Sequence, residues 1–147
     1  MAVKCEYHDN FLTAQAAAAG ALDREAQPCL FDRLDWLESL HRIALRDKTP
    51  ALLQAKGGDA QGWLPLMQVE GGHLVALANW YNFIWAPIFA NADSEVEKLA
   101  LLRGLARLAS KHARRLTLAP MPDEEGSASM VQAAFEASGW SVFREVC

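Results

Sequence analysis

The sequence predicts an α+β or mixed α/β fold, in which helices cover both faces of one sheet. Three observations predict it. Segments with the periodicity of helices alternate with short runs that are typical of strands. The middle of the chain reads strand, turn, strand, turn, strand, and the end reads strand, helix, strand, helix, strand, with crossovers that should be right-handed. The length of 147 residues suits one domain over residues 1–147, and no repeat or low-complexity linker divides it.

The first third of the chain is expected to form a strand and two helices. The stretch VKCEYHD alternates as a short strand, and NFLTAQAAAAGALDREA consists of good helix formers with a possible break at Gly20. FDRLDWLESLHRIAL follows the helical period most clearly. Asp32 can cap its first turn, and Pro50 is expected to end it.

The middle third predicts an antiparallel meander. ALLQAK, WLPLMQVE and HLVALAN are three strand-like runs, separated by GGDAQG and by the pair Gly71-Gly72, which is a strong hairpin signal. Pro65 lies inside the second run. Because proline has no N–H to donate to a ladder, that strand should have a free edge or a bulge nearby.

The last third predicts helix, strand, helix and strand. SEVEKLALLRGLARLASKHA is a long helix that begins near Asp93 or Ser94, with acids at its start and bases at its end, as the helix dipole favours. RRLTLAPM is expected to be a short strand. DEEGSASMVQAAFEASG is expected to be a helix with Gly139 as its C′ residue, and WSVFREV is expected to be the last strand.

The composition limits the function. A formal charge of -4 and a 52% hydrophobic content indicate a soluble globular protein, without the basic face that a nucleic-acid partner would need. No apolar run approaches the roughly 20 residues of a membrane span. Cys5, Cys29 and Cys147 form no C-x-x-C pair, which favours the cytoplasm. The four histidines lack the spacing of metal ligands, so no metal site is expected.

An aromatic segment follows the last strand of the meander. Trp80, Tyr81, Phe83 and Trp85 lie within six positions of the chain. Together with the neighbouring amides Asn79 and Asn82, these rings are candidates for lining a cleft that binds an apolar or planar acceptor. The favoured alternative is that they fill a gap in the sheet or form an interface. Alternate residues of an extended segment face opposite sides, so not all of them can face one pocket.

Four stretches carry a likeness to a known family. They are LFDRLDWLESL, with Phe-x-x-x-x-Trp-Leu at a helix start; WLPLMQVEGGHLVAL, with Leu-Pro-Leu before a hairpin; NWYNFIWAPIF; and FEASGWSVF. In their order and spacing they cover most of residues 29–147. The chain resembles the GNAT acyltransferase superfamily, and looks most like the N-terminal lobe of its two-lobed FemAB-like and CelD-like branch.

The resemblance implies a mostly antiparallel central sheet of about six strands, with a V-shaped opening where the middle strands splay apart. It implies an N-acyltransferase that moves an acyl group from acyl-CoA or acetyl-CoA to a small-molecule amine, by direct attack of the amine. Tyr81 would then be a candidate for the general acid that protonates the departing thiolate. A second GNAT lobe, or a homo-oligomer, is the implied partner.

Two features depart from the family pattern. The link FIWAPIFANADSEVE has no glycine, although a pyrophosphate is usually cradled there by successive backbone N–H groups. It offers Asp93, Glu95 and Glu97, which would repel that anion. The chain also ends at FREVC, where the two-lobed branch would continue into the second lobe. A rival function is therefore open, namely a non-catalytic binding or docking domain that uses the aromatic surface around Trp80–Trp85.

Overall fold

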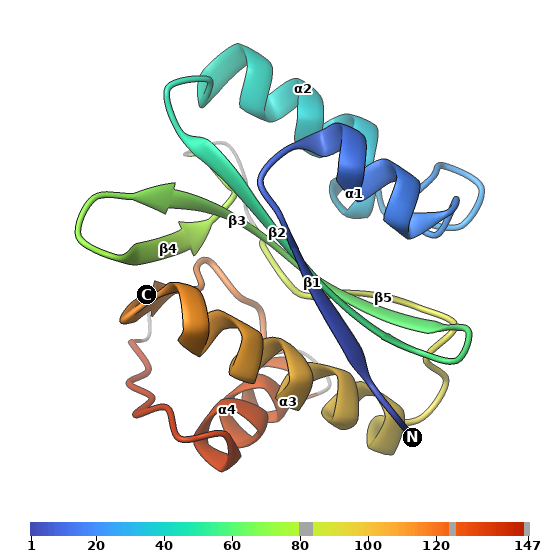
Figure 1. Cartoon of the computed structure of the whole chain (residues 1–147), viewed down its shortest axis with the longest axis vertical. Helices are drawn as coiled ribbons and strands as arrows, with labels where there is room; N and C mark the ends of the chain where they lie inside the picture. The colour runs from blue at the N-terminus through green and yellow to red at the C-terminus, as the bar shows by residue number, and fades with distance from the viewer. Residues whose placement is uncertain (80–83, 124–125, 146–147) are drawn as a thin grey trace.

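The computed structural model describes residues 1–79, 84–123 and 126–145, and it confirms the mixed α+β fold (Figure 1). The elements, in chain order, are β1 (Lys4–His8), α1 (Phe11–Ala18), the 3-10 turn η1 (Leu30–Asp32), α2 (Leu34–Ala44), β2 (Thr49–Gly57), β3 (Ala60–Val69), β4 (His73–Ala76), β5 (Ile88–Ala90), α3 (Glu95–His112), β6 (Arg115–Thr117) and α4 (Ser127–Ala137).

One six-stranded sheet runs through the centre of the molecule. Its order is β1-β2-β3-β4-β6, and the short strand β5 pairs with β3 beside this path. All pairs are antiparallel except β4 with β6, which are parallel and are connected through α3. The meander of β2, β3 and β4 agrees with the sequence prediction. Its second turn needs Gly71 and Gly72, which have φ of 79° and 69°, where other residues are strained.

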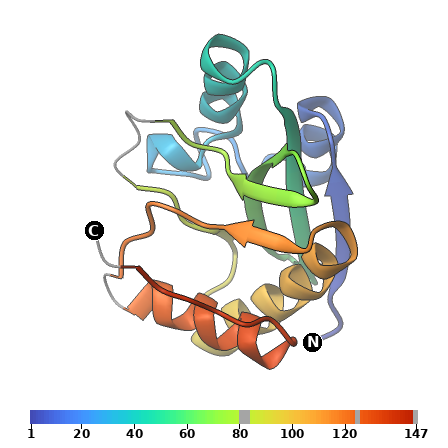
Figure 2. The same ribbon diagram turned by 90° about the vertical axis from the view of Figure 1, so that its left-hand side faces the viewer.

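Helices cover both faces of the sheet, with α1 and α2 on one side and α3 and α4 on the other (Figures 1 and 2). Alternation along β3 divides its side chains between the two cores. Leu64 and Leu66 pack with α3 and α4, whereas Trp63 and Met67 pack with α1 and α2. Among the described residues, no helix combines the length and the apolar character needed to cross a bilayer.

The two N-terminal helices differ from expectation at their ends. The break near Gly20 is present, since α1 ends at Ala18 and is followed by two left-handed residues. Asp32 does not cap α2: the N-cap residue is Arg33, which makes no side-chain capping bond. Asp32 instead belongs to η1, so its carboxyl precedes the helix start. Pro50 does not end α2, which stops at Ala44, but lies in β2.

The predicted last strand is wrong for residues 140–145, which form no strand. Side-chain contacts hold this segment on the helices instead. Trp140 packs against Phe135 and donates from Nε1 to the carbonyl oxygen of Ala106 in α3, at 2.9 Å. Arg144 forms an ion pair with Asp123 at 2.9 Å. Figure 2 shows the segment running back along α4. The β-like pattern of its side chains is therefore used for packing on helices and not for a ladder.

Candidate functional site

The predicted aromatic site lies where β4 ends, but the structure describes only part of it. Asn79 is half-buried and Trp85 is buried. Trp80, Tyr81, Asn82 and Phe83, including the candidate general acid, lie outside the described residues. The described part of the site consists of the strands on either side of this segment and of Trp85.

Strand pairing stops beside this segment, and the unpaired region between β3, the end of β4 and the chain after β6 is called the wedge. The parallel ladder of β4 and β6 joins only His73–Val75 to Arg115–Thr117. On β3, the partner β4 ends opposite Leu66 and the partner β5 begins opposite Trp63. Pro65 lies between these two ladders, as expected for a residue that cannot donate. Its carbonyl oxygen accepts from the backbone N–H of Leu77 at 3.0 Å.

Trp85 fills this wedge. Its side chain is only 4% exposed and belongs to the core on the α3–α4 side. The indole Nε1 donates to Pro65 O at 2.8 Å, and the backbone N–H donates to Pro120 O at 2.6 Å, beyond the end of β6. One tryptophan thus bridges β3 to the chain after β6. Trp85 was a candidate for a substrate-binding or interface surface, and the structure places its side chain in the core.

The start of α3 is closed by its own side chains. Ser94 is the N-cap and accepts from the backbone N–H of Glu97 at 3.1 Å, while the Ser94 hydroxyl donates to the Glu97 carboxylate at 3.1 Å. Glu95 and Glu97 both lie in the first turn. A helix start can hold an anion only if its N–H groups are available and its field is not cancelled. Here an N–H is already bonded, and carboxylates supply the negative charge.

A half-buried carboxyl lies at the entrance to α2. Asp32 sits in η1, next to Phe31, whose ring makes an edge-to-face contact of 5.4 Å with Trp36. Burial raises the pKa of Asp32 above its ordinary value. Raised carboxyl pKa values are common at functional sites, though buried structural groups show them too. The sequence interpretation missed this residue because it treated Asp32 as a helix cap.

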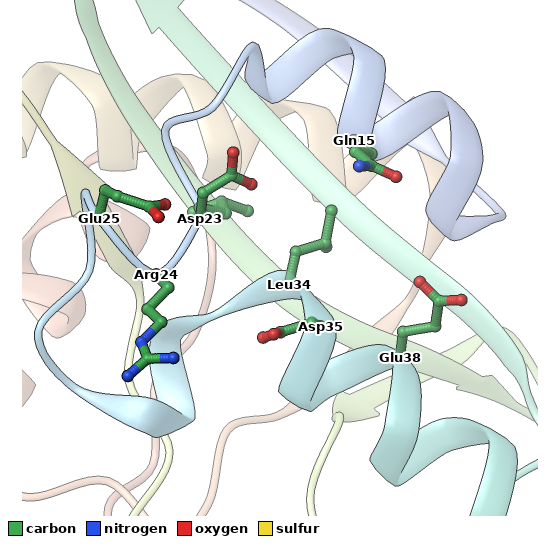
Figure 3. A pocket seen from close by; sticks show the side chains of 8 residues that line it. Gln15, Asp23, Arg24, Glu25, Leu34, Asp35 and Glu38 are labelled. Atoms are coloured by element: carbon green, nitrogen blue, oxygen red, sulfur yellow. The ribbon is translucent and has the colours of Figure 1, made fainter.

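An acidic cavity of about 260 Å³ lies between α1, the following connection and α2 (Figure 3). Its polar lining is made of four carboxylates, one guanidinium and one amide: Asp23, Glu25, Asp35, Glu38, Arg24 and Gln15. Leu22 and Leu34 form the apolar part. Within the described residues, Arg24 forms no ion pair with these carboxylates, so the cavity keeps a negative field that favours a cation. Sequence reasoning missed it because the acids come from two segments.

Two further findings concern metal sites and similarity to known proteins. Within the part of the chain that the structure describes, no three or more His, Cys, Asp or Glu side chains are grouped so that they could hold a metal ion. No family model, no curated protein and no solved structure matches the chain. The features that bear on function are therefore the wedge, the start of α3 and the acidic cavity.

Proposed function

We propose that this chain is a GNAT-like domain that acts as a docking lobe, and that it neither binds acyl-CoA nor catalyses acyl transfer from it. The strand order supports the GNAT-like part of the proposal. The strands β1 to β4 are antiparallel neighbours, and β6 then lies parallel to β4, to which it is connected through α3. By the resemblance, the partner is a second GNAT-type lobe or another copy of the chain, and the partner lobe carries the donor site.

The observation that carries the proposal is the burial of Trp85 in the wedge. A donor that entered the opening between β4 and β6 would have to displace this indole. Removing a buried tryptophan from a core costs about 3–5 kcal/mol, before the loss of its hydrogen bond to Pro65 is counted. A donor would need to recover that energy in the same place.

The start of α3 supports the same conclusion. The donor's pyrophosphate would meet the Ser94–Glu97 capping pair instead of free N–H groups. The carboxylates of Glu95 and Glu97 would repel it at short range. A domain with a filled wedge and an acidic helix start fits a lobe that provides surface and leaves the donor to its partner.

An acyltransferase is the second candidate, because the acidic cavity suits a protonated amine. Four carboxylates and one guanidinium line it, and Figure 3 shows them entering from both sides of the space. If the chain bound a donor elsewhere, this cavity would be the place for an amine acceptor. The two candidates therefore differ in whether acetyl-CoA binds at all.

A thermal-shift scan with acetyl-CoA tests the proposal. A ligand present at 100 times its Kd stabilises the native state by about 2.7 kcal/mol, which moves the melting temperature by several degrees. We expect no shift at saturating acetyl-CoA. A second arm adds a polyamine to the wild type and to Glu38→Gln. A rise of the melting temperature with acetyl-CoA would overturn the docking proposal. If the polyamine raises the melting temperature further, and Glu38→Gln reduces that rise, the acyltransferase is supported.

A further inference from the structure

A carboxylate, an imidazole and a hydroxyl lie in a row at the start of α1, away from both the wedge and the acidic cavity. Glu6 and His8 project from the same side of β1, and Thr13 lies in the first turn of α1. The Nδ1 atom of His8 is 3.1 Å from Thr13 Oγ1. The Nε2 atom of His8 is 3.3 Å from the Glu6 carboxylate. The Thr13 hydroxyl also lies 3.4 Å from the carbonyl oxygen of Asn10, to which it can donate, so its proton has two acceptors within reach. When the hydroxyl turns to Nδ1 of His8, this is the order of groups that activates a hydroxyl as a nucleophile.

The imidazole is held in one orientation while the hydroxyl is accessible. His8 is 7% exposed, and its ring stacks on that of Trp63 at 5.7 Å. Thr13 is exposed on the helix surface. Although Glu6 lies within ion-pair distance, His8 Nε2 makes no hydrogen bond among the described residues. The Glu6 side chain is 65% exposed, so it is free to rotate into line with that nitrogen.

We propose that Thr13 is an acyl-accepting nucleophile, with His8 as its general base and Glu6 as a positioning residue. Thr13 Oγ1 attacks the carbonyl carbon of an activated ester and passes its proton to Nδ1 of His8. The carbon–oxygen bond to the leaving alcohol or phenol then breaks, and the acyl group stays on Thr13 as an ester. The leaving group departs as an alkoxide or phenoxide, or takes the proton back from His8. This role goes beyond the docking role and does not depend on it.

The surroundings select the class of acyl donor. The N-cap Asn10 binds the Thr13 N–H at 2.9 Å, and its amide donates to Asp9 at 2.9 Å. Two carboxylates lie near the row, Glu6 at Nε2 of His8 and Asp9 at the Asn10 amide, and they disfavour a donor that carries phosphates. The donor that fits is a small, uncharged, activated ester of a short-chain acid.

The chain contains a matched control pair. His73 Nε2 lies 2.7 Å from Thr117 Oγ1, so this pair also joins an imidazole to an exposed hydroxyl. Its charged neighbour is Arg115 and not a carboxylate. Burial and the nearby Arg115 lower the pKa of His73. Arg115 thus disfavours the imidazolium that must form when the Thr117 hydroxyl gives up its proton, whereas the charged group beside His8 is the carboxylate of Glu6, at 3.3 Å.

The test is acylation of the full chain by p-nitrophenyl acetate, followed by nitrophenolate release and by peptide mass spectrometry. We expect an acetyl adduct on the peptide that contains Thr13 and none on the peptide that contains Thr117. Thr13→Ala should remove the adduct, and Thr13→Ser should keep it. His8→Gln should slow acylation about 100-fold or more, as for the loss of a general base.

Glu6→Gln tests whether Glu6 positions His8 or only stabilises the fold. Glu6 is exposed, so its replacement should leave the fold intact. It should slow acylation without changing the stability to urea, and Glu6→Asp should restore part of the rate, because a carboxylate again faces Nε2 of His8. Of the two carboxylates near the row, Asp9 remains in Glu6→Gln. The proposal is overturned by equal labelling of Thr13 and Thr117, by the absence of an adduct together with no nitrophenolate release, or by an unchanged rate in both His8→Gln and Glu6→Gln.

Discussion

The two faces of the sheet are stabilised by different means. On the α3–α4 face the core is apolar, and it is built mostly from leucines and alanines together with Trp85, Val131 and Phe135. On the α1–α2 face the core also contains buried amides. Gln54 and Gln61 are both buried, and they donate to the last carbonyl oxygens of α1, those of Ala17 and Ala18, at 3.1 and 3.0 Å.

This difference follows from the lengths of the helices. The long helix α3 buries a continuous stripe of apolar side chains against the sheet. The helix α1 has only eight residues and ends against the sheet. Its C-terminal carbonyl groups would be unpaired there, and two glutamine side chains satisfy them. One face therefore depends on shape and the other on a hydrogen-bond network.

The largest effect is expected from Trp85→Ala on the apolar face. The substitution empties the wedge and removes a buried hydrogen-bond donor, so it should lower the free energy of unfolding by about 3–5 kcal/mol in urea denaturation. Trp85→Phe is the matched control. It keeps most of the ring, and Pro65 O still accepts from Leu77, so a loss of about 1–2 kcal/mol is expected. Equal, small losses in both variants would show that the indole is not a core group.

The next effect is expected from Gln61→Leu on the amide face. Gln61 accepts from Trp63 Nε1 at 2.9 Å and from Gln54 at 3.1 Å, while it donates to Ala18 O. Leucine would leave buried groups unpaired, and the expected loss is about 2–3 kcal/mol. Gln68→Leu is the control on the same strand, where the amide is exposed and bonds only Tyr7 OH among the described residues. It should change stability by less than about 0.5 kcal/mol, and a similar loss there would remove the distinction between the faces.

Much of the fold was open to prediction because its signals are local. Helical periodicity, the glycine pair at Gly71-Gly72 and the capping Ser94 all act within a few residues. The strand β5 was missed because it has only three residues and depends on pairing with residues 61–63 of β3. The segment 140–145 has a strand-like pattern, but its neighbours in space are α3, which accepts from Trp140, and Asp123 with the start of α4, which accept from Arg144. The local sequence pattern therefore predicts an extended backbone, whereas strand pairing depends on residues that are distant in the sequence.

The candidate site was less accessible to prediction for the same reason. Consecutive large rings indicated a special region, but only the positions of Pro65 and Pro120 show that Trp85 points into the wedge. The acidic cavity joins residues on both sides of the α1–α2 connection. The row Glu6, His8 and Thr13 did have a local signal. An acid and a histidine two positions apart on a strand share one face, and the helix that follows brings the threonine next to them.

The smallest effect is expected at two carboxyl groups, one on each face, whose ionisation changes the stability in opposite directions. Burial raises the pKa of Asp32 on the α1–α2 side above its ordinary 3.8. The hydrogen bond from Arg144, helped by the backbone of Ser129, lowers the pKa of Asp123 on the other side below the same value. Ionisation of Asp32 therefore opposes folding, and ionisation of Asp123 favours it.

The pH dependence of two variants tests this contrast. Below pH 3.8 Asp32 is protonated in both states, and its unfavourable contribution develops as the pH rises through its folded pKa. Asp32→Asn should therefore gain stability relative to the wild type between about pH 4 and neutrality. For Asp123 the favourable contribution exists above pH 3.8 and is lost as the pH falls through its lower folded pKa. Asp123→Asn should lose stability at neutral pH and match the wild type in strong acid. Urea denaturation across this pH range measures both, and curves of the same sign would mean that one of the two carboxyls does not have the surroundings described above.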